Sequence, residues 1–444
     1  MPDRLRGQRV LVMGLGRLGG GAGVARFAAE AGADVTVTDI APAEKLGPGL
    51  EAIADLVQAG RVHLRLGSHP ERVLDECDLL IVNPAVPRPW AHPYVATARA
   101  RGVRSTTEIG MLVRRLRERT GRVIGITGTM GKSTTSAMIH HALAEQGVPC
   151  FLGGNIGGSL LSSLDRIDGD STVVLELSSA MLWWLGETVP GWAPRVAVVT
   201  GFEPNHIDWH GSLEHYESSK RMILAGQRGG DHAVLGPGVS DWESREGVHR
   251  HTPASGHVRP MSLPGAHNRE NAAAAIAAVA AMGHDPARAG EAIARFPGLA
   301  HRLQSLGARR GVLCFNDSKS TTPGSAAIAV AAVREKAKDV HLIAGGADKK
   351  IDLFSIASLE VAGLYTIGQT GPAITECARQ VGRPAETCGT LQEAVRIVAS
   401  RAKAGEAILL SPGCASWDQF ENFEHRGEVF ARLIEEHLGT PDAR

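Results

Sequence analysis

The stretch GITGTMGKSTTSAM, residues 125–138, decides the fold of the middle of this chain. An apolar run leads into its glycines and a helix-forming run follows them, which predicts a strand, a tight loop and a helix. Backbone N–H groups of such a loop bind phosphate, and Lys132 and Ser133 add a cation for the β/γ oxygens and a hydroxyl for Mg²⁺. A strict phosphate loop has glycine where Ile126 stands, so the fit is TGTMGKST. We expect a nucleoside triphosphate loop made of Gly128, Thr129, Gly131, Lys132, Ser133 and Thr134.

A second glycine-rich turn, MGLGRLGGG, lies near the start of the chain. Gly14, Gly16 and Gly19 form G-x-G-x-x-G between a predicted strand and a predicted helix, and Asp39 ends the next strand. This arrangement is the dinucleotide fingerprint, in which backbone N–H groups and a helix N-terminus meet a pyrophosphate. Because UDP carries a pyrophosphate as NAD does, the turn by itself leaves a nicotinamide cofactor and a nucleotide-sugar both open.

Length, charge and cysteine usage restrict the class of protein. A chain of 444 residues exceeds the size at which single cores stop growing, so two to three domains are expected. Lys plus Arg and Asp plus Glu both number 47, so no net charge attracts nucleic acid or an acidic membrane. The six cysteines form no C-x-x-C pair, which argues against a zinc site or a disulfide framework. With no apolar signal core in MPDRLRGQRV and no apolar run of membrane-spanning length, we expect a cytoplasmic monomer.

Strand-like and helix-like segments alternate along the chain, which predicts parallel sheets wound with helices. Short apolar strands recur in three blocks, for example RVLVMG, STVVLELSS and EAILLSPG, and RFPGLAHRLQ has the Pro and Gly of a linker. The sequence therefore predicts an α/β protein of three domains. These are an N-terminal Rossmann-like domain (1–106), a central P-loop ATPase-like domain (107–298) and a C-terminal Rossmann-like domain (299–444).

Two stretches of the central block carry candidate metal ligands. Glu176 ends the apolar strand VVLELSS, where a buried carboxylate is unfavourable unless it is paired or binds a metal. A plain cap for the next helix is the alternative. The stretch FEPNHIDWHG brings His206, Asp208 and His210 together, with Lys220 following in YESSK. Structural and functional roles for these groups are equally open on the residues alone.

In the third block, polar residues follow three predicted strands. The stretches are FNDSKSTTPGS, AGGADKK and SPGCASWDQFENFEHRG. The carboxyl ends of parallel strands form the edge at which open α/β sheets bind ligands. Three such stretches in one domain favour a ligand crevice.

Taken in order, these motifs resemble those of the Mur ligases, ATP-dependent enzymes that extend the peptidoglycan stem peptide, and within them the MurD type, which adds D-glutamate. The resemblance covers nearly the whole chain through GITGTMGKST, GGNIG, LELSS, YESSK, HNRENAAAA, NDSKSTT and GGADKK. The most selective motif is SPGCASWDQF, because the SP-x-x-AS-x-D-x-F run distinguishes the D-glutamate enzymes. The resemblance implies that the first glycine turn binds the UDP of UDP-N-acetylmuramoyl-L-alanine and the second binds ATP.

The resemblance also implies a role for individual residues. The UDP-sugar would be bound by Leu15, Gly16, Asp39 and Asn155. One Mg²⁺ would lie on Ser133 and Glu176, and a second on His206 and Lys220. A lysine ammonium has no acceptor atom for a cation, but in this family the lysine is carbamylated and so becomes carboxylate-like. Lys132, His206 and Lys220 would be the catalytic residues.

The remaining implied contacts concern ATP and the amino acid. Asn268 and Asn271 match adenine contacts, and Arg302 and Asp317 match phosphate and ribose contacts. The D-glutamate pocket would be formed by Lys319, Thr321, Lys349, Ser416 and Phe423. The implied reaction runs through an acyl phosphate that the glutamate amine attacks.

Some residues depart from the family's usual pattern. These are Met130, Ala180, Met181, Asn205 and Trp209. None is a predicted Mg²⁺ ligand, so we expect the activity class to survive, while L-glutamate stays open as the acceptor. An oxidoreductase would leave Lys132 and the third domain unexplained. A non-catalytic scaffold would not need Lys220, Lys349 and Ser416.

Overall fold

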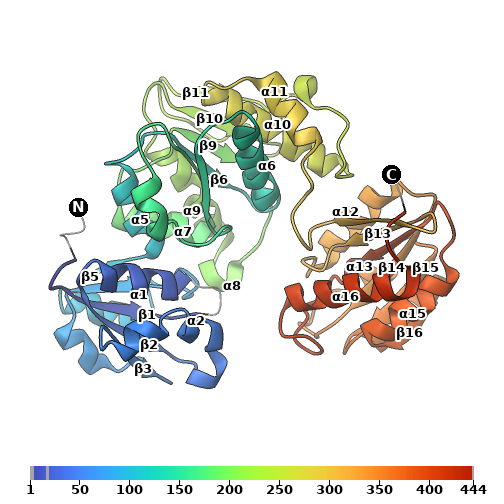
Figure 1. Cartoon of the computed structure of the whole chain (residues 1–444), viewed down its shortest axis with the longest axis horizontal. Helices are drawn as coiled ribbons and strands as arrows, with labels where there is room; N and C mark the ends of the chain where they lie inside the picture. Colours follow the sequence, from blue (N-terminus) through green and yellow to red (C-terminus); the bar gives the residue numbers. More distant parts are fainter. Residues whose placement is uncertain (1–4, 17–19, 443–444) are drawn as a thin grey trace. The chain divides into compact units, whose positions relative to one another are not determined.

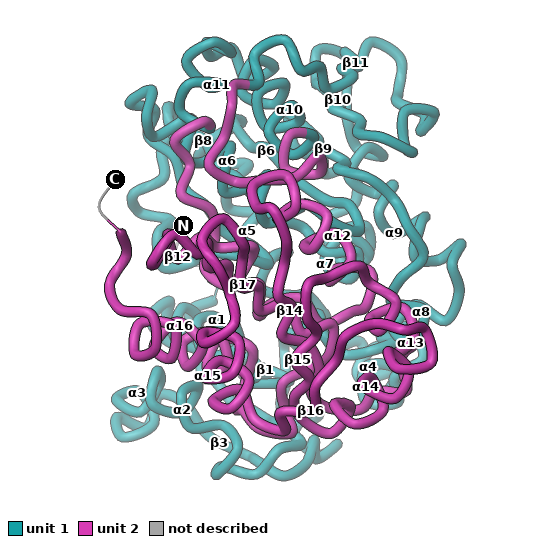
Figure 2. Tube along the Cα trace, turned by 90° about the vertical axis from the view of Figure 1, so that its right-hand side faces the viewer, with its two compact units in different colours: residues 1–258, 270–293 teal, residues 259–269, 294–444 magenta. Residues whose placement is uncertain are grey.

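The computed structural model describes residues 5–16 and 20–442 and contains three sheets, each flanked by helices (Figure 1). This arrangement confirms the predicted α/β class. Gly19 of the first glycine motif lies outside the described residues. The chain divides into two compact units, residues 1–258 with 270–293 and residues 259–269 with 294–444 (Figure 2), which are described separately. The first unit contains two sheets, and the predicted boundaries at 106/107 and 298/299 stay predictions.

The first sheet is fully parallel, with strand order β3-β2-β1-β4-β5. Its two faces are covered differently, because alternate residues of β1 point to opposite sides. Val10 and Val12 pack with α1, while Leu11 and Met13 pack with α4. The elements are β1 (Arg9–Met13), α1 (Gly20–Glu30), β2 (Asp34–Asp39), α2 (Gly47–Glu51), α3 (Ala54–Gln58), β3 (Val62–Leu66), β4 (Leu79–Val82), α4 (Pro93–Ala100) and β5 (Arg104–Thr106).

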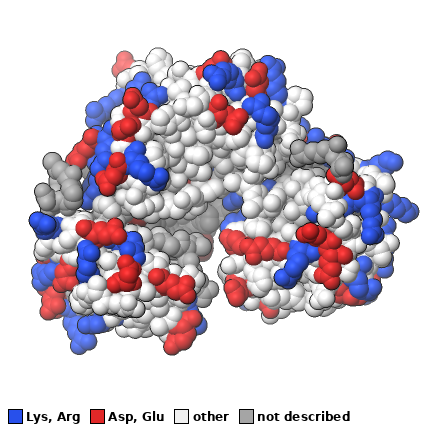
Figure 3. Space-filling model, viewed as in Figure 1, with Lys and Arg blue, Asp and Glu red and all other residues white. Residues whose placement is uncertain are grey.

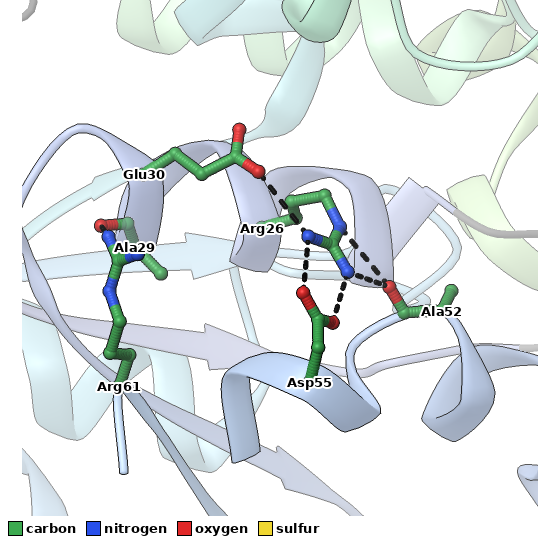
Figure 4. A network of polar contacts seen from close by, with 6 residues as sticks. All are labelled: Arg26, Ala29, Glu30, Ala52, Asp55 and Arg61. Carbon is green, nitrogen blue, oxygen red and sulfur yellow. Dashed lines mark hydrogen bonds and ion pairs between the residues drawn. The ribbon is translucent and has the colours of Figure 1, made fainter. Parts of the chain in front are cut away.

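Helix α1, which follows the first glycine turn, is bonded to neighbouring segments through the side chains of Arg26 and Arg61 (Figure 4). The Arg26 guanidinium donates to both carboxylate oxygens of Asp55, to Glu30, and to the Ala52 carbonyl at 2.7 Å. Arg61 donates to the Ala29 carbonyl near the C-terminal end of the helix. A bidentate pair combined with backbone acceptors fixes geometry better than a lone surface ion pair does.

The second sheet is also parallel, with order β11-β10-β9-β6-β8-β7. Its strands are β6 (Val123–Thr127), β7 (Cys150–Gly154), β8 (Thr172–Glu176), β9 (Val196–Val199), β10 (His232–Leu235) and β11 (His249–His251). Its helices are α5 (Glu108–Leu116), α6 (Lys132–Glu145), α7 (Ser179–Thr188), α8 (Ile207–His210), α9 (Leu213–Ala225), α10 (Ala266–Ala281) and α11 (Pro286–Ala294).

One side chain of the second sheet's helices belongs to the core of the first sheet. Trp184 of α7 is 1% exposed and packs in one cluster with Leu11, Met13, Leu80 and Tyr94. Nearby, the Trp90 ring lies 5.3 Å from Trp183 and 5.5 Å from Trp209, measured between ring centroids. Together with a larger hydrophobic cluster that contains residues of both sheets, such as Val10 and Leu175, these contacts join the two sheets in one compact unit.

The third sheet has order β12-β13-β17-β14-β15-β16, with β12 antiparallel to β13 and all other pairs parallel. Its strands are β12 (Gln304–Arg309), β13 (Val312–Asn316), β14 (Val340–Gly345), β15 (Gly363–Ile367), β16 (Ala385–Gly389) and β17 (Ala407–Leu410). Its helices are α12 (Pro323–Arg334), α13 (Leu353–Ala357), α14 (Gly371–Gln380), α15 (Leu391–Arg401) and α16 (Phe423–Leu438).

The mixed surface charge and the short or polar helices agree with the balanced charge and the lack of long apolar runs in the sequence. On the face drawn in Figure 3, acidic and basic side chains are interspersed. Within residues 5–16 and 20–442, every helix is too short or too polar to cross a bilayer.

Candidate functional site

The predicted phosphate loop connects β6 to α6, and two of its glycines are required by space. Gly128 has φ +141°, and a Cβ there would lie 2.0 Å from Thr200 Oγ1. Gly131 has φ +81°, and a Cβ there would lie 2.3 Å from Asn271 Oδ1. Positive φ and close contact with Thr200 and Asn271 both exclude a side chain, so these two positions require glycine. The strand, loop and helix predicted from residues 125–138 are therefore confirmed.

Two lysines converge on this loop. The Lys132 ammonium donates to the carbonyls of Gly128 at 2.9 Å and Thr129 at 2.8 Å. The Lys220 ammonium, from α9, donates to the same Gly128 carbonyl at 2.6 Å. Burial and then the Lys132 charge lower the pKa of Lys220 to about 6, and Glu176 opposes this shift. At neutral pH the Lys220 side chain is therefore largely an uncharged amine.

Glu176 stands at the end of β8, the neighbour of β6, and is 1% exposed. Its Oε1 accepts a hydrogen bond from Asn155 Nδ2 at 2.7 Å. Its Oε2 is buried and has no hydrogen-bond partner within residues 5–16 and 20–442. The cap of α7 is Ser178, whose side chain accepts from Met181 N, so the helix-cap alternative for Glu176 is wrong. An unpartnered buried carboxylate oxygen is unfavourable, and a bound cation would satisfy it.

His206 precedes the short helix α8 with a left-handed backbone, φ +51°. Its ring lies 6.0 Å from the Tyr216 ring, and the Tyr216 hydroxyl is 3.1 Å from Thr129 Oγ1 of the phosphate loop. The side chain reaches solvent, but partial burial and then the Lys132 and Lys220 charges lower its pKa. A neutral imidazole in this position is able to ligate a metal.

The other two polar groups of FEPNHIDWHG lie elsewhere. His210 is buried, with Nε2 2.9 Å from Ser179 Oγ and Nδ1 2.8 Å from His215 Nδ1. Asp208 is exposed. Of the three groups considered together in the sequence, His206 is therefore the one directed at the phosphate loop. Among the described residues, no group of three or more His, Cys, Asp or Glu is arranged to hold a metal.

The first glycine turn contacts the acidic residue at the end of β2. Asp39 Oδ2 accepts from Leu15 N at 2.9 Å and Gly16 N at 3.2 Å, and Oδ1 accepts from Ala41 N at 2.8 Å. The structure thus brings Leu15, Gly16 and Asp39 together, as predicted. Their contact with a nucleotide-sugar stays a prediction.

The two asparagines of α10 are both buried. Asn271 Oδ1 accepts from Thr135 Oγ1 at 3.3 Å, so it lies beside the phosphate loop and α6. Asn268 Nδ2 donates to the Pro264 carbonyl at 2.7 Å. The division into two compact units falls between these residues.

In the second unit, the three polar loops follow β13, β17 and β14, which are adjacent strands. Gly413 N donates to Ser320 O at 3.1 Å and Ala347 N donates to Ala415 O at 2.9 Å, so the loops are bonded to one another. The prediction that the three stretches share one edge of the sheet is confirmed, because parallel strands place all their carboxyl ends together.

Predicted acceptor residues meet aromatic rings in these loops. Lys319 Nζ lies 3.5 Å from the centroid of the Phe423 ring, and Lys349 Nζ lies 4.0 Å from the centroid of the Trp417 ring. Trp417 is 67% exposed. The aromatic faces hold two cations at the open edge of the sheet, which suits an anionic ligand.

Asp317 directly follows β13, and its carboxylate accepts two hydrogen bonds, from Leu303 N at 2.9 Å and from Ser411 Oγ at 2.8 Å. Burial raises its pKa to about 7, although these bonds and the Arg302 charge act in the opposite direction. The end of the unit at which β13 stops thus contains Arg302, Asp317 and the loop with Lys319 and Thr321. The backbone around Thr321 leads into α12 through a capping box at Thr322.

Some residues of the site were missed by reasoning from the sequence. Arg426 lies buried beneath the loops after β13 and β17, and Trp184 joins two sheets. Arg426 stood in the quoted stretch SPGCASWDQFENFEHRG, whereas Trp184 stood in no quoted motif. Neither a charged residue on a helix nor a tryptophan pair signals its partner in the sequence.

Comparisons with known proteins agree over the whole chain. Residues 8–107 match the MurD-like N-terminal domain of Mur ligases, residues 126–237 match the Mur ligase middle domain, and residues 301–414 match the Mur ligase glutamate ligase domain. A UDP-N-acetylmuramoylalanine–D-glutamate ligase from Roseiflexus sp. (strain RS-1) is 36% identical over 97% of this chain and 99% of its own. The enzyme of the same name from Pelotomaculum thermopropionicum is 34% identical over 96% and 97%.

Solved structures show the same fold. The UDP-N-acetylmuramate–alanine ligase MurC from Thermotoga maritima has a TM-score of 0.62 at 20% identity, covering 97% of this chain and 99% of its own. The MurF ligase from the same organism, solved with ADP, has a TM-score of 0.60 at 16% identity, covering 99% and 96%.

Proposed function

We propose that this chain, which belongs to the Mur ligase family and within it to the MurD type, joins D-glutamate to UDP-N-acetylmuramoyl-L-alanine at the expense of ATP. The observation that supports this most directly is the phosphate loop, where the side-chain nitrogens of Lys132 and Lys220 converge near the buried carboxylate of Glu176. The two glycine-rich turns then have separate ligands, the UDP of the sugar nucleotide and ATP.

In the proposed reaction, a carboxylate oxygen of the alanine attacks the γ-phosphorus of ATP and ADP leaves. The amine of glutamate attacks the carbonyl carbon of the acyl phosphate, inorganic phosphate leaves, and a proton is lost from the new amide nitrogen. Lys132 stays close to the loop and neutralises charge that builds on the γ-phosphoryl oxygens. Positioning and such electrostatic stabilisation account for most of the rate in phosphoryl transfer.

Ser133 and Glu176 would hold one Mg²⁺ at the triphosphate. The fit is supported by Glu176 Oε2, a buried acceptor whose missing partner a hard cation would replace. When bound, Mg²⁺ supplies further neutralisation of phosphate charge. Asn155 donates to the other carboxylate oxygen and so orients Glu176.

Lys220 is suited to carbamylation. Only a neutral amine adds to CO₂, forming an N–C bond and releasing a proton, and burial keeps this amine largely neutral at pH 7. The resulting carbamate would carry oxygen acceptors toward a second Mg²⁺ shared with His206. Because both lysines donate to the Gly128 carbonyl, the carbamate would also place a negative charge near the Lys132 ammonium.

For the acceptor amino acid, Lys319 and Lys349 supply cations and Ser416 a hydroxyl. We assign these residues, with Thr321 and Phe423, to the D-glutamate pocket. Asn268, Asn271, Arg302 and Asp317 are assigned to ATP. We place the reaction in the cytoplasm, where ATP is available and free thiols such as Cys77 persist, and we keep the predicted monomer, which light scattering would check.

Phosphate release with UDP-N-acetylmuramoyl-L-alanine, ATP and a panel of D-glutamate, L-glutamate and D-aspartate tests the proposal. We expect D-glutamate to be used preferentially and release without any amino acid to be negligible. Preference for L-glutamate would show that L-glutamate is the acceptor and would leave the assignment to the ligases unchanged. Absence of amino-acid-dependent release with every acceptor would refute the function.

A second experiment tests Lys220. We expect Lys220→Ala to lose activity and a short carboxylic acid to restore part of it, because the acid replaces the carbamate oxygens. In wild-type protein supplied with ¹³C-bicarbonate, a carbamate carbon signal should appear and be missing in Lys220→Ala. Full activity of Lys220→Ala without additive would remove this residue from the metal site.

A further inference from the structure

Arg426 of α16 is a buried cation next to the acceptor loops. It is 1% exposed, and all three nitrogens of its guanidinium donate hydrogen bonds. Nε donates to Ser318 Oγ at 3.0 Å and Nη2 to Ser318 O at 2.8 Å, while Nη1 and Nη2 both donate to Cys414 O at 3.2 Å. Within the described residues, none of its hydrogen bonds goes to a carboxylate, and burial lowers its pKa to about 10.

These bonds connect the two loops that carry predicted acceptor residues. Ser318 directly precedes Lys319 in the loop after β13, and Cys414 lies two residues before Ser416 in the loop after β17. Ser318 Oγ in turn donates to the carbonyl of Phe423 at 2.8 Å. Ser318 and Cys414, the partners of the guanidinium, therefore lie close to three of the five predicted acceptor residues. Lys319 and Ser416 are one and two positions away in the sequence, and the Phe423 carbonyl accepts from Ser318 Oγ.

Stability alone is a weak explanation for this arrangement. A buried charged group with its hydrogen bonds is often no more stabilising than a well-packed apolar side chain, so its presence points to a geometric requirement. The planar fork fixes the directions of its acceptors, which an ammonium cannot do. Here those acceptors are the backbones of two separate loops.

We propose that Arg426 is a positioning residue of the acceptor site, whose guanidinium holds the Lys319 loop and the Ser416 loop at the separation that a dicarboxylate amino acid requires. The assignment of the ligand rests on the proposed function. The claim that the guanidinium sets the geometry of the two loops rests on the structure alone.

The same unit offers a matched control. Arg309 of β12 is also buried, at 6% exposed, and its guanidinium also donates to backbone carbonyls, those of Gly439 at 2.8 Å and Leu306. These acceptors lie in β12 and just past the C-terminal end of α16, the end opposite Phe423, and neither lies in a loop with a predicted acceptor residue. Arg309→Lys therefore removes a buried guanidinium that also bonds backbone carbonyls, and it leaves the acceptor loops unchanged.

Steady-state kinetics with Arg426→Lys and Arg309→Lys gives the first test. For Arg426→Lys we expect the KM for the amino acid to rise about 10- to 100-fold, the factor that one lost charge-assisted hydrogen bond is worth, with the KM for ATP nearly unchanged. Arg309→Lys should leave both constants near wild type. Ser318→Ala, which removes one acceptor and keeps the fork, should give a smaller rise and serves if Arg426→Lys does not fold.

A readout that needs no turnover follows the loop itself. Trp417, next to Ser416, is the single tryptophan of residues 294–444 in the sequence, so its ¹⁹F signal in 5-fluorotryptophan-labelled protein is assignable with Trp417→Phe. We expect Arg426→Lys to shift or broaden this signal and Arg309→Lys to leave it unchanged. If wild-type protein shows no amino-acid-dependent turnover, the proposed function fails, and this signal alone decides the claim about the loops.

Two results would overturn the inference. One is an unchanged Trp417 signal together with an unchanged amino-acid KM in Arg426→Lys and Ser318→Ala. The other is an equal effect of Arg309→Lys, which would reduce Arg426 to a general stabilising residue.

Discussion

Replacing Trp184 by alanine should loosen the first sheet from the second. The side chain is 1% exposed and fills a cluster with Leu11, Met13, Leu80 and Tyr94, although it is carried by α7 of the second sheet. Truncating a buried aromatic side chain costs about 3 to 5 kcal/mol. Among the residues that the structure describes, the indole N–H has no hydrogen-bond partner, so removing it relieves a desolvation penalty of about 1 to 3 kcal/mol. Taking about 5 kcal/mol for tryptophan, the largest side chain, less about 2 kcal/mol for the relieved penalty, we expect a net loss of about 3 kcal/mol.

Hydrogen exchange followed by mass spectrometry measures this change locally. In Trp184→Ala, amides of β1 and β4 should exchange faster by a factor on the order of 100, which corresponds to about 3 kcal/mol of opening free energy. Amides of β14 and β15 in the other compact unit should not change. Urea unfolding should show the first sheet melting before the rest.

Two control variants separate the role of this residue from a general effect of losing tryptophan. Trp184→Phe keeps an aromatic ring and removes the unpartnered N–H, so it should cost less than about 1.5 kcal/mol. Trp242→Ala removes a buried tryptophan that packs against Arg221 and Phe202 instead, and should leave β1 exchange unchanged. Equal protection of β1 in Trp184→Ala and wild type would refute the reasoning.

The remaining predictions concern the phosphate loop and Asp317. Lys132→Ala should reduce turnover by a factor on the order of 10² to 10³ with an unchanged melting curve, and near-wild-type phosphate release would argue against its role. Gly128→Ala should abolish ATP binding measured by calorimetry, because its Cβ would lie 2.0 Å from Thr200 Oγ1, whereas Gly121→Ala meets no atom within 4 Å and should bind normally. The pKa of Asp317 is raised from 3.8 to about 7, so the folded state keeps a proton that the unfolded state loses, and stability should fall as pH rises from about 4 to about 7. Urea midpoints of Asp317→Asn should lack this slope, and parallel pH profiles of variant and wild type would contradict the assignment.

Local chain geometry is what made much of the site predictable from the sequence. A loop such as TGTMGKST determines its own backbone shape, since Gly128 and Gly131 adopt positive φ and Lys132 opens α6. Parallel strands also place their carboxyl ends at one edge, so the loops carrying Asp317, Lys349 and Ser416 were expected to meet, and they do.

Tertiary structure decided the features whose partners lie far away in the chain. In the sequence Arg426 looks like a solvated helix residue, yet it bonds Ser318, 108 positions away, and is fully buried. Trp184 is carried by α7 of the second sheet but packs in the core of the first sheet. The sequence by itself determined the three α/β blocks, the phosphate loop and the family, because those depend on short-range patterns. Only the folded chain decided which buried charge organises the acceptor loops and which tryptophan joins the sheets, because burial and hydrogen-bond partners arise from contacts that no local pattern encodes.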